Sequence, residues 1–116
     1  DGRELPTDPQ PSWLGYSVGK WEGDTLVVDT IGITEQTWMD NAGRPHSDAL
    51  HTIERYRRRT FGSLDVTLTI DDPKAYTRPW TVDESSSQLV LGQDLLEYVC
   101  TENNRDVEHL VGDGQK

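Results

Sequence analysis

Alternation of apolar and polar positions dominates this chain. The clearest case is LDVTLTI, residues 64–70, where leucine, valine and isoleucine alternate with aspartate and threonine. A period of two places the apolar side chains on one face of a strand. Roughly seven or eight such short segments, with turn residues about every ten positions and no helical period, predict an all-β protein.

The first half of the chain predicts a hairpin, a loop and a long strand. Residues 13–33 hold two strand-forming segments around the turn residues 22–24, Glu-Gly-Asp. Residues 34–47 predict a loop with a short strand at 38–39. The run DALHTIERYRRR, residues 48–59, predicts a strand with imperfect alternation.

The second half predicts further strands after residues 64–70. Residues 74–82 predict a strand, and the polar run DESSSQ at 83–88 predicts a loop. Residues 89–100 predict one or two more strands, and residues 101–112 predict a loop with a short final element. Together these elements predict a compact antiparallel jelly roll or cupin-like sandwich.

The organisation predicted is an arm followed by one domain. Residues 1–12 carry three prolines and no periodicity, which indicates an extended arm, and residues 13–116 form a single β-sandwich domain. Hydrophobic residues make up only 33% of the chain, so the core is thin and a homodimer that covers one sheet face is expected. The single cysteine, Cys100, lies in an alternating apolar run and predicts a buried thiol.

Charge limits the partners. The net charge of −10 disfavours nucleic acid and suits a neutral or cationic partner, polysaccharide included. Four arginines (Arg55, Arg57, Arg58 and Arg59) would divide between two strand faces, where ion pairs with the surplus of carboxylates are the favoured role. No apolar run reaches the length that spans a membrane. A secreted or periplasmic protein without its leader is expected, or a fragment of a larger secreted protein.

The histidines are candidate metal ligands. His46 follows Gly-Arg-Pro in a loop, His51 lies in a strand, and His109 comes from the other end of the chain. Three imidazoles can hold one copper, iron or zinc ion, and Glu54 would supply an oxygen or support a ligand. The alternative is that the three are unrelated surface or half-buried histidines.

Part of this pattern resembles the first cupin motif, carried by Gly43, His46, His51, Glu54 and Gly62. The motif places its two histidines one residue apart, whereas here they are five positions apart in the sequence. The second cupin motif is not found, so His109 would have to replace its histidine. The resemblance implies a small jelly roll, commonly dimeric, with copper, iron, manganese or nickel.

Longer segments, WEGDTLVVDTIG, TIDDPKAYTRPW and LLEYVCTENNRDVEHLVG, are similar to a group of secreted bacterial proteins without an assigned activity. Among small cupin-like metalloproteins, the chain resembles copper-dependent enzymes that cleave cellulose oxidatively. This resemblance implies a copper enzyme acting on a polysaccharide, with His46, His51, His109 and Glu54 at the metal. Iron, manganese and zinc are the alternative metals. A hydrolase or isomerase that uses one of these three metals at the same site is a further alternative.

Aromatic residues define a second kind of candidate site. Several flat aromatic rings on one face of the sheet would stack on sugar rings. A small β-protein also needs large side chains to fill its core, and core packing is the favoured role for each of these aromatic residues. The residues concerned are Trp13, Tyr16, Trp21, Trp38, Tyr76 and Trp80. Trp38 is expected to be the most exposed and to bind substrate. Arg55, or alternatively Arg57, would lie beside His51 and orient the ligand. The alternative function is therefore a non-catalytic β-domain that binds carbohydrate or another small ligand.

Paired carboxylates invite a comparison with glycosidases. The adjacent pair Asp71-Asp72 precedes Pro73, and neighbouring residues in a turn direct their side chains apart. A glycosidase needs two carboxyl groups that face each other across the scissile bond. Turn formation is therefore the favoured role of this pair.

Overall fold

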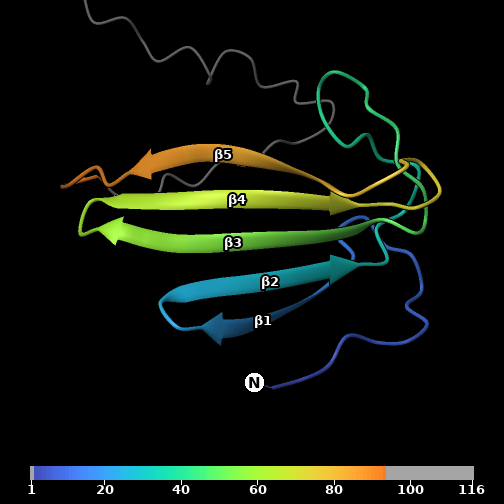
Figure 1. Ribbon diagram of the computed structural model, residues 1–116, viewed down its shortest axis with the longest axis horizontal. Coiled ribbons are helices and arrows are strands. Elements are labelled where there is room, and N and C mark those ends of the chain that lie inside the picture. The colour runs from blue at the N-terminus through green and yellow to red at the C-terminus, as the bar shows by residue number, and fades with distance from the viewer. Residues whose placement is uncertain (1, 94–116) are drawn as a thin grey trace, which may run out of the picture.

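The fold is a single antiparallel sheet, seen in a computed structural model that describes residues 2–93, with the backbone alone at residues 83–85 (Figure 1). Within this part of the chain the strands are β1 (Tyr16–Glu22), β2 (Thr25–Ile31), β3 (His51–Thr60), β4 (Ser63–Asp71) and β5 (Trp80–Gln88). Each strand pairs with the next, so the sheet is an up-and-down meander in the order β1-β2-β3-β4-β5. The predicted all-β class is confirmed. The second sheet of a sandwich is not found among residues 2–93.

Turn chemistry explains the two hairpins that the sequence predicts most clearly. Gly23 has a φ of +64° in the two-residue turn between β1 and β2, a conformation that glycine adopts without steric cost. Phe61 and Gly62 form the turn between β3 and β4. Residues 34–47 form a loop as predicted, but the expected short strand at residues 38–39 is absent from it.

The last strand differs from its prediction. Residues 74–79 form a turn, and β5 begins only at Trp80 and runs through residues 83–88, which were predicted to be a loop. The turn forms because the Asp72 carboxylate and carbonyl accept hydrogen bonds from the backbone that follows, and because Pro79 has no N–H for a strand ladder. The serine-rich run pairs with β4 because that strand offers an open edge. Residues 94–116, with the strand, loop and Cys100 predictions that fall on them, lie outside the described residues.

The strand register separates two faces. One, here called the apolar face, carries Trp21, Leu26, Val28, Leu64, Val66, Leu68, Ile70, Trp80 and Val82, with Glu54, Tyr56 and Arg58 among them. The other, the polar face, carries Lys20, Asp29, His51, Arg55, Arg57, Asp65, Thr67 and Thr69. Register alone assigns these side chains, because cross-strand partners point to the same side of a sheet.

One end of the sheet is covered by irregular chain. The N-terminal arm and the long connection from β2 to β3 both lie at the end where β2 and β4 finish (Figure 1). Ser12 joins the two by donating its N–H to Gly32 at 2.9 Å and accepting the N–H of Thr34 at 2.9 Å. Among the described residues only Val27, Leu50 and Ile70 are buried hydrophobic side chains, so the core is as thin as the composition predicts.

No helix in the part of the chain described here is long and apolar enough to cross a membrane.

Candidate functional site

Two tryptophans line a hollow at the covered end of the apolar face. Trp13 lies between the arm and β1, and Trp38 lies in the β2–β3 connection. The hollow that they line with residues of the sheet has a volume of about 340 Å³. Its remaining lining is formed by Ile33, Thr37, Met39, His46, Leu50, Thr52, Leu68 and Ile70. The size lies at the lower end of the range of small-molecule sites, which are mostly apolar with a few polar groups.

Both tryptophans are open to solvent. The exposed fraction is 66% for Trp13 and 78% for Trp38, which confirms the prediction that Trp38 is exposed. Core packing, the favoured role for each aromatic residue, is wrong for these two, for Trp21, which is 70% exposed, and for Tyr16, which is 42% exposed. The reason is that the described chain supplies one layer at these positions, with no second layer to bury the rings against.

A glycine sets the position of Trp13. Gly15 has a φ of +66° and lies directly before β1, so the chain reverses between Trp13 and the first strand. A Cβ at this position would stand 2.5 Å from the carbonyl oxygen of Ile31 and 2.9 Å from the side chain of Ile33. Only glycine therefore lets the arm pass this close to the end of β2.

His46 is held by protein groups at both ring nitrogens. Nε2 lies 2.8 Å from the Thr37 hydroxyl, and Nδ1 lies 3.1 Å from the carbonyl oxygen of Ser47. Because a carbonyl only accepts, Nδ1 carries the proton of this second bond. The ring is thus a fixed wall of the hollow, and neither nitrogen is directed at an open position.

A buried carboxylate fastens the loop that carries His46. Asp72 is 1% exposed and accepts the N–H of Ser47 at 2.6 Å, the hydroxyl of Ser47 at 2.7 Å, and the N–H groups of Lys74 and Ala75 at 3.1 and 3.2 Å. Burial opposes ionisation of this carboxyl, but these hydrogen bonds outweigh the burial and lower its pKa. The predicted turn role of the Asp71-Asp72 pair is confirmed for Asp72. Its long-range bonds to Ser47 were not predicted.

The second histidine lies on the other side of the sheet. His51 Nε2 is 3.0 Å from Oδ1 of Asp29, and both residues belong to the polar face. His46 lines the hollow with Thr52 and Ile70, which belong to the apolar face. The structure therefore does not bring His46 and His51 together. His109 lies outside the described residues.

Glu54 has a structural partner of its own. It lies on the apolar face, where the Tyr56 hydroxyl donates a hydrogen bond to Oε1 at 2.8 Å. Its side chain and that of His51 point to opposite sides of β3, because their positions differ by an odd number. Residues 2–93 contain no group of three histidine, cysteine or acidic side chains placed to hold a metal ion. The described residues alone thus do not fit a copper site, and the four-ligand set stays a prediction.

Arg55 and Trp38, the two predicted substrate-binding residues, are not brought together. Arg55 is exposed on the polar face, opposite Val27 and Thr67, whereas Trp38 lines the hollow on the apolar side. The ion pairs predicted for the neighbouring arginines are confirmed for two of them. They join Arg57 to Asp24, with Nε 3.4 Å from Oδ2, and Arg59 to Asp65, with Nε 2.7 Å from Oδ2.

A second hollow adjoins the first. It has a volume of about 520 Å³ and shares Met39, Leu68 and Ile70 with the tryptophan-lined hollow. Its far side holds the rings of Tyr76 and Trp80, which meet edge to face with their centroids 5.7 Å apart. The ion pair of Asp40 with Arg44 stands at its rim. The two hollows therefore lie next to each other on the apolar face.

Comparison with known proteins finds no similar protein. No family model, no curated protein and no solved structure matches the chain.

Proposed function

We propose that the protein is a carbohydrate-binding β-domain that holds a sugar ring between Trp13 and Trp38. The observation that carries the proposal is the presence of both exposed tryptophans on the lining of one hollow. Exposed indole rings are unfavourable in water unless they contact a partner. The C–H groups of a sugar ring carry partial positive charge and pack on the negative face of an indole ring.

The polar groups beside the two hollows suit a neutral saccharide. The ion pair of Asp40 with Arg44 offers carboxylate and guanidinium groups beside the hollows. Such groups donate to and accept from sugar hydroxyls. The net charge of −10 repels a polyanionic chain, so a neutral polysaccharide such as cellulose is the favoured ligand. The adjoining hollow would receive a second sugar unit.

The test is the binding of hexasaccharides to tryptophan variants. Calorimetric titration of the full chain with cellohexaose, xylohexaose and mannohexaose should give saturable binding to at least one of them. Trp13→Ala and Trp38→Ala should each raise the Kd about tenfold or more, because each removes one stacking face from the ligand.

Trp21→Ala is the matched control. Trp21 is similarly exposed but lies on β1 outside both hollows, so its removal should change the Kd less than about twofold. Absence of binding to all three hexasaccharides would contradict the proposal. An equal loss in all three variants would contradict the assignment of the hollow as the site.

Copper-dependent oxidative cleavage of a polysaccharide, on a cupin-like jelly roll, is the second candidate. One observation favours it: His51 is held by the Asp29 carboxylate, as metal-ligating histidines commonly are. The candidate requires that His109 join His51, and it makes copper the resident metal. A homodimer and a secreted or periplasmic location belong to this proposal as well.

Metal analysis and electron paramagnetic resonance test this candidate. The full chain loaded with copper should retain one ion per chain after desalting and show a Cu(II) spectrum that changes in His51→Ala. Arg57→Gln, a change on the same face that leaves every histidine in place, should leave the spectrum unchanged. Failure to retain copper, or an unaltered spectrum in His51→Ala, would exclude His51 as a ligand.

A further inference from the structure

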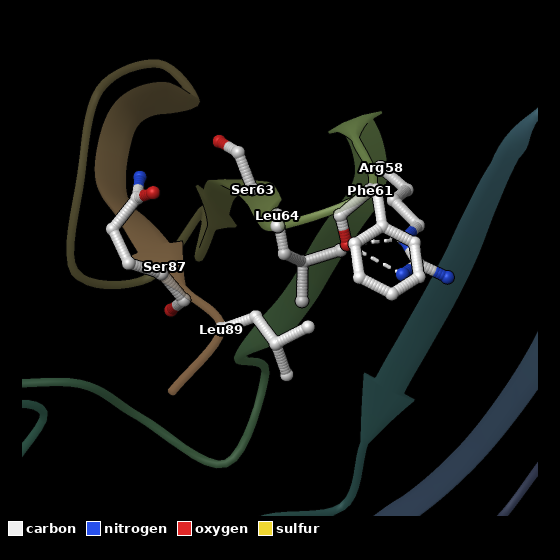
Figure 2. A pocket seen from close by; sticks show the side chains of 8 residues that line it. Arg58, Phe61, Ser63, Leu64, Ser87 and Leu89 are labelled. Atoms are coloured by element: carbon white, nitrogen blue, oxygen red, sulfur yellow. Dashed lines mark hydrogen bonds between the residues drawn. The ribbon is translucent and has the colours of Figure 1, made fainter. Parts of the chain in front are cut away.

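A third hollow lies at the opposite end of the apolar face, beside the turn between β3 and β4. It has a volume of about 370 Å³ and is lined by Arg58, Phe61, Gly62, Ser63, Leu64, Ser87, Gln88 and Leu89. Figure 2 shows the side chains of Leu64 and Leu89 directed toward the same space, with Phe61 and Arg58 together on one side of it. The N–H of Leu89 donates to the carbonyl of Gly62 at 2.9 Å, which closes the strand end around the hollow.

Arg58 is held in one orientation at this site. Its Nε donates to the carbonyl oxygen of Phe61 at 3.2 Å, its Nη2 donates to the same oxygen, and its guanidinium carbon lies 5.0 Å from the centre of the Phe61 ring. A guanidinium has five N–H donors, and these contacts use two of them. Two of the three remaining donors, one on Nη1 and one on Nη2, lie on a common edge that matches the two oxygens of a carboxylate.

The partners of Arg58 differ from those of the neighbouring arginines. Arg57 and Arg59 pair with aspartates, whereas Arg58, on the apolar face, pairs with no carboxylate in the part of the chain that the structure describes. Its partners there are a neutral carbonyl and an aromatic ring. In a protein with a net charge of −10, a fixed cation beside an apolar hollow is a local site for an anion.

We propose that this hollow binds a small carboxylic acid with an apolar body. The carboxylate would accept hydrogen bonds from the Nη1 and Nη2 edge of Arg58, and the hydrocarbon part would lie against Phe61, Leu64 and Leu89. The residues that line the hollow explain both parts of the ligand. The apolar side chains favour a hydrocarbon body over a small hydrophilic anion, and the fixed guanidinium selects a carboxylate. This site is separate from the tryptophan-lined hollow and does not depend on the proposed function.

The experiment is a titration of the full chain with octanoate, followed by amide chemical shifts. Octanoate should bind saturably and shift the amides of Phe61, Gly62 and Leu89 most. Octanol, which has the same chain without the charge, and octylamine, which has the opposite charge, should bind at least about tenfold more weakly. Arg58→Gln should weaken octanoate binding about tenfold or more and leave the weak binding of octanol unchanged.

Two further variants test whether octanoate binding depends on the guanidinium group of Arg58 itself. Arg57→Gln removes a neighbouring arginine from the polar face and should leave the Kd for octanoate within about twofold of its original value. Arg58→Lys should keep part of the affinity, because lysine retains the charge and lacks the two-pronged geometry. No saturable shift with octanoate, equal binding of octanol, or equal losses in Arg57→Gln and Arg58→Gln would each overturn the proposal.

Discussion

Replacing Asp72 by alanine is expected to lower the free energy of unfolding by about 2–4 kcal/mol. The carboxylate accepts four hydrogen bonds, two of them from Ser47, and the side chain is almost completely buried. Alanine would leave the N–H groups of Ser47, Lys74 and Ala75 without this acceptor. A buried donor without a partner costs more than an average hydrogen bond contributes.

Acid should act on the same network. Because hydrogen bonds lower the pKa of Asp72 below its ordinary value, the ionised carboxylate stabilises the fold fully above about pH 4. This contribution is lost as the pH falls through the ordinary value toward the lower pKa of the folded state. The unfolding free energy of the unmodified protein should therefore fall on acidification from pH 5 to pH 2, and part of this fall should be missing in Asp72→Asn, which has no carboxyl to protonate.

Urea unfolding at several pH values measures both effects. Asp48→Asn is a suitable control, because Asp48 is exposed and its ion pair with Lys74 lies on the surface. Its unfolding free energy should change by less than about 1 kcal/mol. Equal stability of Asp72→Ala and the unmodified protein, or an identical acid dependence in Asp72→Asn, would contradict the structural role given to this carboxylate.

Replacing Gly15 by alanine is expected to cost about 2–4 kcal/mol of stability. The left-handed conformation alone costs a residue with a Cβ about 1–2 kcal/mol. In addition, the new Cβ would stand 2.5 Å from the carbonyl oxygen of Ile31, which is backbone and cannot rotate away. The strand end or the arm would have to shift, and Trp13 would move with the arm.

Gly23 provides the matched control for this substitution. Its φ is +64°, close to the +66° of Gly15, but a Cβ there would meet nothing within 4 Å. Gly23→Ala should therefore lose about 1–2 kcal/mol, the conformational cost alone. Thermal or urea unfolding of the two variants separates the clash from the backbone strain. Equal losses would show that the arm does not pass as close to β2 as the structure describes.

The two variants also bear on the proposed sugar site. Gly15→Ala should weaken saccharide binding because Trp13 is displaced, whereas Gly23→Ala should leave binding unchanged in the folded protein. Asp72→Ala should have a smaller effect on binding, since Asp72 fastens the loop at Ser47 and is not among the residues that line the hollow.

Local pattern was sufficient for most of the strands. The hairpin over residues 13–33, the strand around residues 51–60 and the alternating strand at 64–70 follow from period two and from glycine at the turns, because both signals act between neighbouring residues. The strand at 83–88 was missed. Serine has no strong preference for a strand, and the open edge of β4 decided its conformation.

In the candidate site, too, some features could be predicted from local sequence and others depended on the tertiary structure. Exposure of Trp38 was predictable from its polar loop neighbours, and the arginine ion pairs were predictable for Arg57 and Arg59 from the surplus of acidic residues. Burial of Trp13 was predicted wrongly, because exposure depends on whether another layer of chain reaches the ring. The positions of His46 and His51 on opposite faces depended on how the connection folds back over the sheet.

By itself, the sequence determined that this is an all-β chain with a thin core, tight turns and a strongly acidic surface. These properties depend on alternation, turn residues and composition, which are local or additive. Only the tertiary structure decided that Trp13 and Trp38 line one hollow, that Asp72 reaches Ser47 across 25 positions, and that Arg58 stands beside an apolar hollow. Such contacts join residues far apart in the chain, and their geometry follows from strand register and loop path rather than from any neighbouring residues.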